Sequence, residues 1–249
     1  MAADELVEPF ERMLAQLFSP ARLREIERDE DWRTERSEIE RSGFLDALAP
    51  EGEGGAALDF GAVVPLFVAL GRHAAPLEIG AAMIARGTPD EAKRAAANAV
   101  LHAAAIAGAA DRLLAMTVAH ANERVQFGKP VGRQQAVQQQ LATMAEETVA
   151  VRIAAELAGH ARWPDARRAA LAKFVASDAA PRIAAVAHAV HGAIGMSAEH
   201  DAQLFTRRLH AWRAACGSES LWARRLGAEL IASGERPVDW VRGSLFGEI

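Results

Sequence analysis

The chain has 249 residues, of which 51% are hydrophobic and 24% charged, and this composition excludes a disordered or collagen-like protein. Its 57 Ala, six Thr and no Tyr exclude an all-β fold, because the best helix former is abundant while strand-favouring residues are scarce. A net charge of -5 and a single cysteine speak against a nucleic-acid partner and against disulfides. We therefore expect an all-α protein.

The N-terminus and the apolar stretches bear on the cellular location. The first residues, MAADELVEPFERM, are acidic, whereas a secretory or transit peptide is basic. The longest uncharged stretches, such as residues 95–110, are mostly Ala with an Asn and a His, and they fall short of the roughly 20 apolar residues of a membrane span. We expect a cytoplasmic protein with no membrane span, in which these stretches are buried helices.

Residues 1–87 predict an N-terminal helical domain. Apolar residues recur there at helical spacing, and a Ser-Pro pair at residues 19–20 gives the signal for a helix start. A glycine-rich loop at residues 51–55 divides the region. The expected helices are 4–18, a short one from 19, 32–48 with an interruption near Gly43, and 60–86 with breaks near Gly71 and Pro76.

Residues 88–249 predict an antiparallel bundle of long helices. Residues 88–91, Thr-Pro-Asp-Glu, combine a capping box with Pro at the first helical position, and residues 128–130, Gly-Lys-Pro, form a helix stop. The helix between them is about 54 Å long at 1.5 Å per residue. Short turns between long rods are typical of a bundle. The expected helices cover 90 to about 127, 133–161, 165–191, 199–215 and 218–232.

Eight histidines raise the question of a metal site. Di-iron bundles need Glu-x-x-His on two helices, and none of the eight has Glu three residues before it. His188 and His191 lie at i and i+3 and could share a metal, but no carboxylate accompanies them on that face. We expect structural or surface histidines and no metal.

The segment NERVQFGKP, residues 122–130, is the most specific feature of the sequence. It places the guanidinium of Arg124 and the ring of Phe127 at the end of a long helix, beside the N-terminus of the next. That arrangement suits an anion with a flat appendage. An ordinary helix-turn-helix with an arginine favoured by the helix dipole explains the same residues, and spacing alone does not decide between the two.

These residues also resemble the acyl-CoA dehydrogenase family, whose first long C-terminal helix ends in R-x-x-F-G-K-P and is followed by a Q-A-V-Q helix. Here the two motifs are residues 124–130 and 135–138. Residues 191–196, HGAIGM, are similar to the family's Q-x-x-G-G-x-G turn. The resemblance covers most of the chain, because further similar segments are GFL at 43–45, EGEGG at 51–55 and LGRH at 70–73.

The resemblance stops where the family has a middle β domain. Only residues 87–91 occupy that place here. In the family the flavin lies between that β domain and the bundle, so the resemblance implies that this chain does not complete a flavin pocket alone. It implies FAD held mainly by a full-length acyl-CoA dehydrogenase partner, in a hetero-oligomer expected to be α2β2, as in the heteromeric dehydrogenases of steroid side-chain degradation.

The cofactor-binding residues follow only from the resemblance. Arg124, Gln126 and Phe127 match the motif that, in the family, reaches across a subunit interface to the FAD pyrophosphate and adenosine of the neighbour. The turn motif is eroded, because Ala189 stands at its glutamine position and Ala193 at its second glycine. The implied cofactor-binding set is Arg124, Gln126, Phe127, Gln134, Gly192 and Ala193.

The resemblance implies no catalytic residue in this chain. The family's base is a glutamate before a glycine at the head of a late helix, or a residue near the start of the long helix, and Cys216 and Asn98 occupy these positions. A base must stand on the acyl α-carbon, and a thiol with an ordinary pKa of about 8.5 is a poor substitute for a carboxylate. We expect Cys216 to be a small buried side chain.

The implied function is a subunit of a heteromeric FAD-dependent acyl-CoA dehydrogenase. The assembly would carry out α,β-desaturation of an acyl-CoA, and the chain alone would be inactive. The alternative is a structural or regulatory paralogue that caps a dehydrogenase without touching its cofactor. The retained Arg124 and Phe127 argue against this alternative, whereas the eroded positions Ala189 and Ala193 argue for it.

Overall fold

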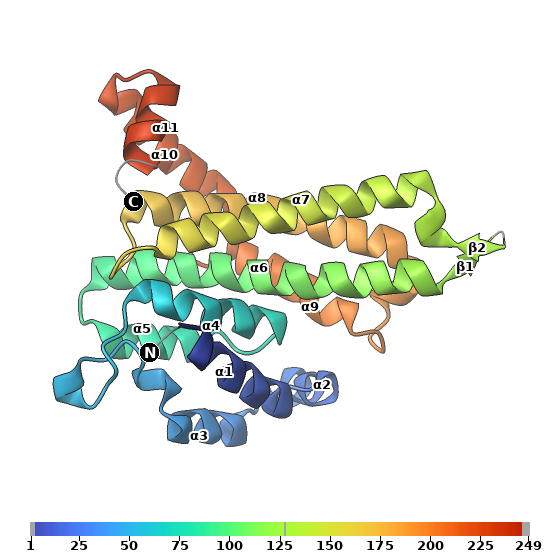
Figure 1. Ribbon diagram of the computed structural model, residues 1–249, viewed down its shortest axis with the longest axis horizontal. Helices are drawn as coiled ribbons and strands as arrows, with labels where there is room; N and C mark the ends of the chain where they lie inside the picture. Colours follow the sequence, from blue (N-terminus) through green and yellow to red (C-terminus); the bar gives the residue numbers. More distant parts are fainter. Residues whose placement is uncertain (1–2, 127, 246–249) are drawn as a thin grey trace.

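The computed structural model describes residues 3–126 and 128–245, and within them it is helical almost throughout (Figure 1). In this part of the chain, five helices precede the long bundle, with two 3-10 turns between the third and the fourth. The expected all-α fold is confirmed. The five helices are α1 (Ala3–Leu17), α2 (Pro20–Asp29), α3 (Arg33–Ser42), α4 (Phe60–Arg72) and α5 (Glu78–Gly87).

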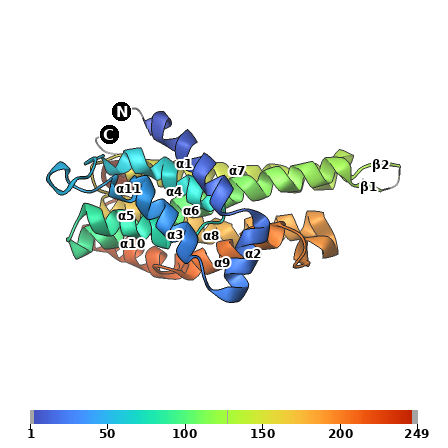
Figure 2. The same ribbon diagram turned by 90° about the horizontal axis from the view of Figure 1, so that it is seen from below.

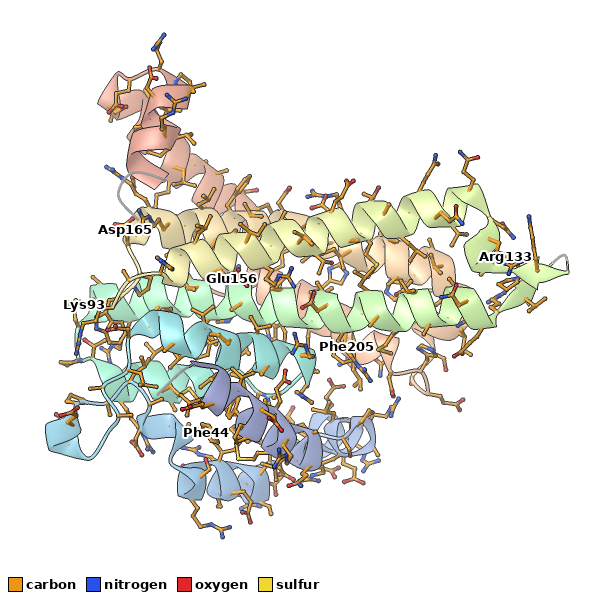
Figure 3. All side chains as sticks on the ribbon, viewed as in Figure 1. Phe44, Lys93, Arg133, Glu156, Asp165 and Phe205 are labelled. Carbon is orange, nitrogen blue, oxygen red and sulfur yellow. The ribbon has the colours of Figure 1, made fainter. Side chains whose placement is uncertain are left out.

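The second part of the chain forms long antiparallel helices joined by short connections. Helices α6, α7 and α8 run along the longest axis of the molecule, and α9 packs against α6 and α8 (Figure 1). Arg133 lies at one end of this bundle, and Lys93 and Asp165 lie at the other (Figure 3). The helices are α6 (Glu91–Glu123), α7 (Gln135–Gly159), α8 (Ala166–His191), α9 (Ala202–Ala214), α10 (Glu219–Ser233) and α11 (Pro237–Leu245).

Helix α6 is the central helix of the molecule. It packs against α4, α7, α8 and α9, and its Ala-rich face is buried among them. By length and composition α6 is apolar enough to cross a membrane, yet 67% of its most apolar window is buried inside the protein. The expectation of a buried helix over residues 95–110 is therefore confirmed.

Two glycines bring α4 and α6 into backbone contact. A Cβ atom on Gly71 would lie 1.9 Å from the carbonyl oxygen of Ala105, and one on Gly108 would lie 1.9 Å from the carbonyl oxygen of Val68. Only glycine allows so close an approach. This crossing fixes the N-terminal helices on the bundle, while the division into domains at residues 87 and 88 stays a prediction.

The end of α6 differs from the expectation of a helix to residue 127. The helix ends at Glu123, and Arg124 has an extended backbone with ψ 116°. Residues 125–126 (β1) then pair with residues 129–130 (β2) in an antiparallel hairpin. Gly128 has φ +77°, which favours a turn over continued helix. The result is a short arm that projects beyond the long helices (Figures 1 and 2).

Helix α11 extends the structure beyond the last element that the sequence predicts. It packs on α8 and α10. Trp240 is its buried residue, and the guanidinium carbon of Arg167 lies 5.9 Å from the centre of the Trp240 ring. Trp240 is the one buried residue among 237–243, the part of this helix whose burial is described, and one buried position gives no periodic pattern from which to predict a helix.

Candidate functional site

The end of α6 meets the end of α8 at Arg124. The Nη1 atom of Arg124 donates a hydrogen bond to the carbonyl oxygen of His191, with a distance of 3.2 Å between the two atoms. Gly192 follows with φ +65°, and a Cβ atom on it would lie 3.8 Å from Arg124 Nη1. The fold therefore brings together two motif segments that are far apart in the sequence.

The guanidinium of Arg124 retains most of its hydrogen-bonding capacity. An arginine side chain has five N–H donors, and a single hydrogen bond, to His191, is formed with the described residues. No described carboxylate forms an ion pair with Arg124, and the residue is exposed. An exposed, unneutralised guanidinium is suited to binding an anion such as a diphosphate.

The remaining predicted cofactor residues lie around Arg124. Gln126 is exposed on β1, and Gln134 is the half-buried N-cap of α7, without a side-chain capping bond. Ala193 is exposed in the 3-10 turn after α8. Phe127 lies outside the described residues. The structure thus places the described members of this set at one end of the bundle.

The segments that meet at Arg124 also expose apolar side chains. Val125 on the hairpin is 62% exposed, and Ile194 and Met196 on the turn after α8 are 50% and 70% exposed. These side chains are accessible to another chain, and an apolar patch is typical of such an interface where exposed side chains of this kind are contiguous. We call residues 124–126 and 192–196 the Arg124 face.

Cys216 lies in the connection between α9 and α10, and the expectation that it is buried is wrong. The residue is exposed and has φ +54°, and Gly217 follows with φ +94°. Two consecutive residues in the left-handed conformation form a turn that leaves Cys216 exposed. The general tendency of cysteines to be buried could not predict this turn. Desolvation of its sulfur still raises the pKa of the Cys216 thiol, so it is a poor base at neutral pH.

A buried lysine holds this turn from inside. The side chain of Lys173 on α8 is fully buried, and its Nζ atom donates to Ser177 Oγ at 2.7 Å. It also donates to the carbonyl oxygens of Arg213 and Gly217, each at 2.9 Å. Burial lowers the pKa of Lys173 to about 8. The sequence gives no sign of this lysine, because one charged residue in a helix is ordinarily exposed.

Asn98, the second position where the family has a base, is a half-buried residue of α6. Its Nδ2 atom donates to the carbonyl oxygen of Arg94 at 2.8 Å. An amide that donates to its own helix cannot take a proton from a substrate. One helical turn further on, Nδ1 of His102 donates to the carbonyl oxygen of Asn98 at 2.8 Å.

A cleft of about 750 Å³ opens beside His102, between the N-terminal helices and the bundle. It is lined by residues of α2, α5, α6 and α9, among them Glu27, Glu78, Arg208 and Trp212. Arg208 Nη1 donates to Glu27 Oε1 at 2.6 Å, so this part of the lining is internally neutralised. The cleft does not reach the Arg124 face, and its lining includes neither Cys216 nor Asn98.

The sequence spacing pairs His191 with His188, but in the structure His191 clusters with two other histidines. His191 lies beside His120 and His200, with ring centres 4.5 Å and 4.9 Å away. These three residues come from α6, from the end of α8 and from the turn before α9. No pattern within one helix could have predicted the group.

Three comparisons relate the chain to known proteins. The family model "Acyl-CoA dehydrogenase, C-terminal domain" matches residues 85–231. The acyl-CoA dehydrogenase IpdE2 of Mycolicibacterium smegmatis is 37% identical over 133 residues, which are 53% of this chain and 42% of that protein. The matched part of the chain therefore spans less than half the length of this relative.

Two solved structures share the fold over nearly the whole chain. The ChsE4-ChsE5 complex from Mycobacterium tuberculosis contains a chain with a TM-score of 0.80 at 18% identity, covering 94% of this chain and 98% of that one. The Tcur3481-Tcur3483 steroid ACAD gives a TM-score of 0.80 at 21% identity, covering 94% and 99%. The helical domains are thus those of acyl-CoA dehydrogenases without the middle β domain. Since the family model spans more than half of the sequence, the chain belongs to the acyl-CoA dehydrogenase family.

Proposed function

We propose that this chain is a subunit of a heteromeric, FAD-dependent acyl-CoA dehydrogenase, in which its Arg124 face completes the FAD site of a full-length partner. The observation that carries the proposal is the unneutralised Arg124 guanidinium, held by His191 beside Gly192. These residues fit the diphosphate of FAD, because they offer free N–H donors and a position without a Cβ atom. They do not fit the flavin ring, for which the family uses the missing β domain.

The nature of the partner is supported by the solved complexes. Both structural neighbours are pairs of named proteins, and in each the matching chain is covered almost completely by this one. We propose an α2β2 assembly and, because one of the two neighbours is a steroid ACAD, a steroid side-chain CoA ester as substrate. The reaction is α,β-desaturation, and FAD, when bound, accepts the hydride.

The proton must be removed by the partner. Cys216 has a raised pKa and lies in a turn that is hydrogen-bonded from inside, and Asn98 is an amide bonded to its own helix. The chain alone is therefore expected to be colourless and inactive towards any acyl-CoA. A yellow, active protein purified without a partner would contradict the proposal.

A structural or regulatory paralogue is the second candidate. The exposed Ala189 and Ala193 favour it, because the family has glutamine and glycine at these positions. Such a subunit would cap a dehydrogenase without touching FAD. The two candidates differ in what the loss of the Arg124 guanidinium does to flavin retention.

The deciding experiment measures FAD content in the complex captured with this chain. Arg124→Ala removes a charge-assisted contact of about 1.5 to 3 kcal/mol, which is roughly 10- to 150-fold in flavin affinity. Arg124→Lys should recover only part, because an ammonium lacks the planar fork. Arg133→Ala, an exposed arginine close to the hairpin (Figure 3), is the matched control. If the Arg124→Ala complex retained as much FAD as the wild type, the chain would be a structural or regulatory subunit that does not contact FAD.

The substrate class needs its own assay. The wild-type complex should oxidise a steroid side-chain CoA ester faster than a straight-chain acyl-CoA of similar mass, measured with an artificial electron acceptor. Equal or inverted rates would reject the steroid assignment without affecting the role of Arg124.

A further inference from the structure

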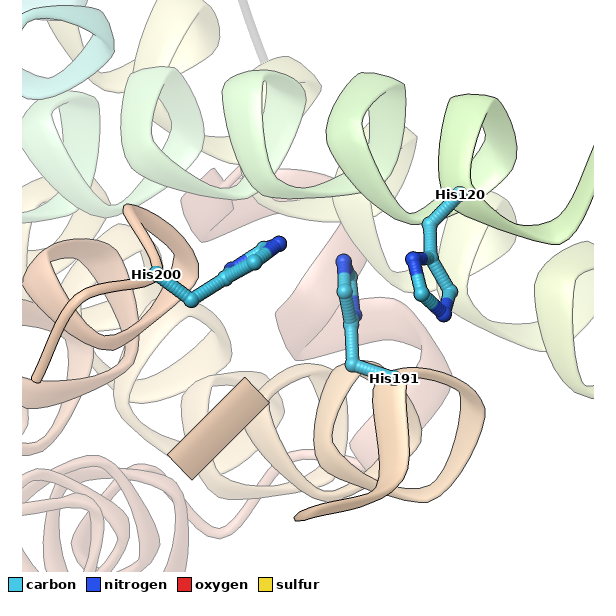
Figure 4. A group of neighbouring side chains, drawn as sticks. All are labelled: His120, His191 and His200. Atoms are coloured by element: carbon cyan, nitrogen blue, oxygen red, sulfur yellow. The ribbon is translucent and has the colours of Figure 1, made fainter. Parts of the chain in front are cut away.

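Three histidines form a cluster (Figure 4), and the carbonyl oxygen of one of them, His191, accepts the hydrogen bond from Arg124. His120 belongs to α6, His191 is the last residue of α8 and His200 precedes α9. One nitrogen atom from each ring lies within 4.8 Å of the other two. The cluster therefore joins three segments at the point where Arg124 bonds to the main chain of His191.

Two atoms of this cluster lack hydrogen-bond partners. Nε2 of His120 and Nε2 of His191 are buried without a partner, and among the side chains that the structure describes, those of residues 5–126 and 128–243, they are the only buried polar atoms in this state. A buried polar atom without a partner is costly, and in native proteins it points to an ordered water or an ion. Both atoms belong to rings of one cluster, so a ligand bound between these rings would give them a partner.

The protonation of His191 leaves its Nε2 atom available as a ligand. Nδ1 lies 2.9 Å from the carbonyl oxygen of Ala187, and because a carbonyl only accepts, Nδ1 carries the proton. Metal-binding histidines are commonly held by this kind of hydrogen bond, which fixes the tautomer and directs the lone pair of Nε2. Burial lowers the pKa of His120 and of His191, so both rings are neutral near pH 7.

His200 is the third ring and the one that has to adjust most. Its Nδ1 atom accepts a hydrogen bond of 3.2 Å from the backbone N–H of Ala202. If Nε2 of His200 binds a metal ion, the proton of the neutral ring moves to Nδ1, and Nδ1 can no longer accept this hydrogen bond. Zn–N bonds of about 2.0–2.1 Å place tetrahedral ligand nitrogens roughly 3.4 Å apart. The three nitrogens lie within 4.8 Å of one another, so the rings, of which His120 and His191 are stacked, have to rotate and bring them closer by up to about 1.4 Å.

The chemical type of the ligands in the cluster indicates which class of metal ion it could bind. The cluster contains imidazoles and neither a carboxylate nor a thiolate, and imidazole ligands suit Zn²⁺, Co²⁺, Ni²⁺ and Cu²⁺ rather than Mg²⁺ or Ca²⁺. Gly195 closes the cluster from one side, because a Cβ atom there would lie 2.6 Å from Cβ of His191. The backbone thus packs directly on this ring.

We propose that His120, His191 and His200 form a binding site for a divalent transition-metal ion of the zinc class. The ion links α6, α8 and the start of α9, and so fixes the carbonyl group to which Arg124 is bonded. This site is independent of the proposed FAD role, since it lies within one chain and requires no partner.

The test uses the full chain without a histidine tag, stripped with EDTA and dialysed. Isothermal titration with Zn²⁺ should show one ion per chain with a dissociation constant of micromolar or below, and Co²⁺ should give visible ligand-field absorption. The variants His120→Gln and His200→Gln should each weaken zinc binding at least tenfold. His210→Gln, an exposed histidine of α9 outside the cluster, should bind as the wild type does.

Folding is checked by circular dichroism of each metal-free variant, and a variant that loses its helical signal is replaced by the corresponding His→Asn change. Sub-stoichiometric binding by the wild type would overturn the proposal and leave an ordered water as the ligand of the cluster. Unchanged affinity in both cluster variants, or an equal loss in His210→Gln, would overturn it as well.

Discussion

The two ends of helix α8 differ in how much hydrogen-bonding capacity their charged side chains have left. At one end the guanidinium of Arg124 is exposed and bonds to a single carbonyl oxygen, that of His191. At the other end Lys173, about 27 Å away along the helix at 1.5 Å per residue, donates to three oxygen atoms inside the protein. A charge with free donors can bind a ligand, whereas a charge without them serves the fold.

The motif positions follow the same division. At the Arg124 end, the arginine and Gly192 of the family motifs are retained. Near Lys173 lie Cys216 and Asn98, which the family resemblance implies at the places of the base, and neither is a carboxylate. Variants at these two places should therefore separate cofactor binding from stability.

The largest expected effect on stability is that of Lys173→Met. The change removes the three hydrogen bonds that Lys173 donates to Ser177 and to the carbonyl oxygens of Arg213 and Gly217, and only longer bonds of 3.2 Å, from Ser177 Oγ and Trp222 Nε1, remain to these two carbonyls. We expect a loss of about 3 kcal/mol. The melting temperature should fall by roughly 6–12 °C. Lys93→Met, at a side chain that is 50% exposed, is the control and should shift stability by less than about 0.5 kcal/mol. Equal melting temperatures for the two variants would contradict a structural role for Lys173.

The pH dependence of stability tests whether Lys173 is buried and desolvated in the folded protein. The pKa of Lys173 in the folded protein is about 8, below its ordinary value of 10.5, so the unfolded chain binds more protons between these two pH values. Stability then rises with pH across this window, and the difference between the values corresponds to up to about 3 kcal/mol.

Urea denaturation at pH 8 and pH 10.5 checks this expectation. Both the reference protein and Lys173→Met should carry Cys216→Ala, so that the thiol does not titrate. The reference should gain stability relative to the Lys173→Met protein as the pH rises. A constant or shrinking difference would mean that Lys173 is not desolvated in solution.

Arg124→Ala should show the reverse pattern. Removing an exposed arginine at a helix end should cost less than about 1 kcal/mol of stability, while the complex loses flavin to the extent given above. Melting temperature and FAD content are measured on the same samples. A large stability loss with normal flavin content would place Arg124 with Lys173 as a structural residue and remove the contrast between the ends.

The smallest effect is expected for Cys216→Ala. The side chain is exposed and makes no side-chain hydrogen bond within the described part of the chain, so stability should change by less than about 0.5 kcal/mol. Turnover of the complex should equal that of the wild type. A tenfold drop in turnover with normal flavin content would show that the thiol takes part in the reaction.

Most helices could be predicted because their signals are local. Asp90 caps α6 through bonds to the backbone N–H groups of Ala92 and Lys93, and Asp165 caps α8 in the same way. The capping residues and the helical periodicity of the alanines can be recognised within a few residues of sequence. The start of each long helix is accordingly close to the expected position.

The parts that could not be predicted depend on distant residues or on single backbone angles. The contact of Arg124 with His191 and the grouping of His191 with two other histidines need the register of α6 against α8. The hairpin and the exposure of Cys216 follow from positive φ angles at Gly128, Cys216 and Gly217. The motif residues of the cofactor site were identifiable only through the family resemblance.

The glycine crossing of α4 and α6 has a consequence for how chain segments can be exchanged. Gly71 and Gly108 bring the backbones of α4 and α6 together, and α5 itself packs on α6, so contacts outside residues 88–90 hold these helices side by side. The link between those helices is short, and two of its three residues, Pro89 and Asp90, are exposed. Lengthening such a link adds only a slowly growing loop-closure entropy. A whole domain could therefore be inserted or removed at this link while the helices stay packed together.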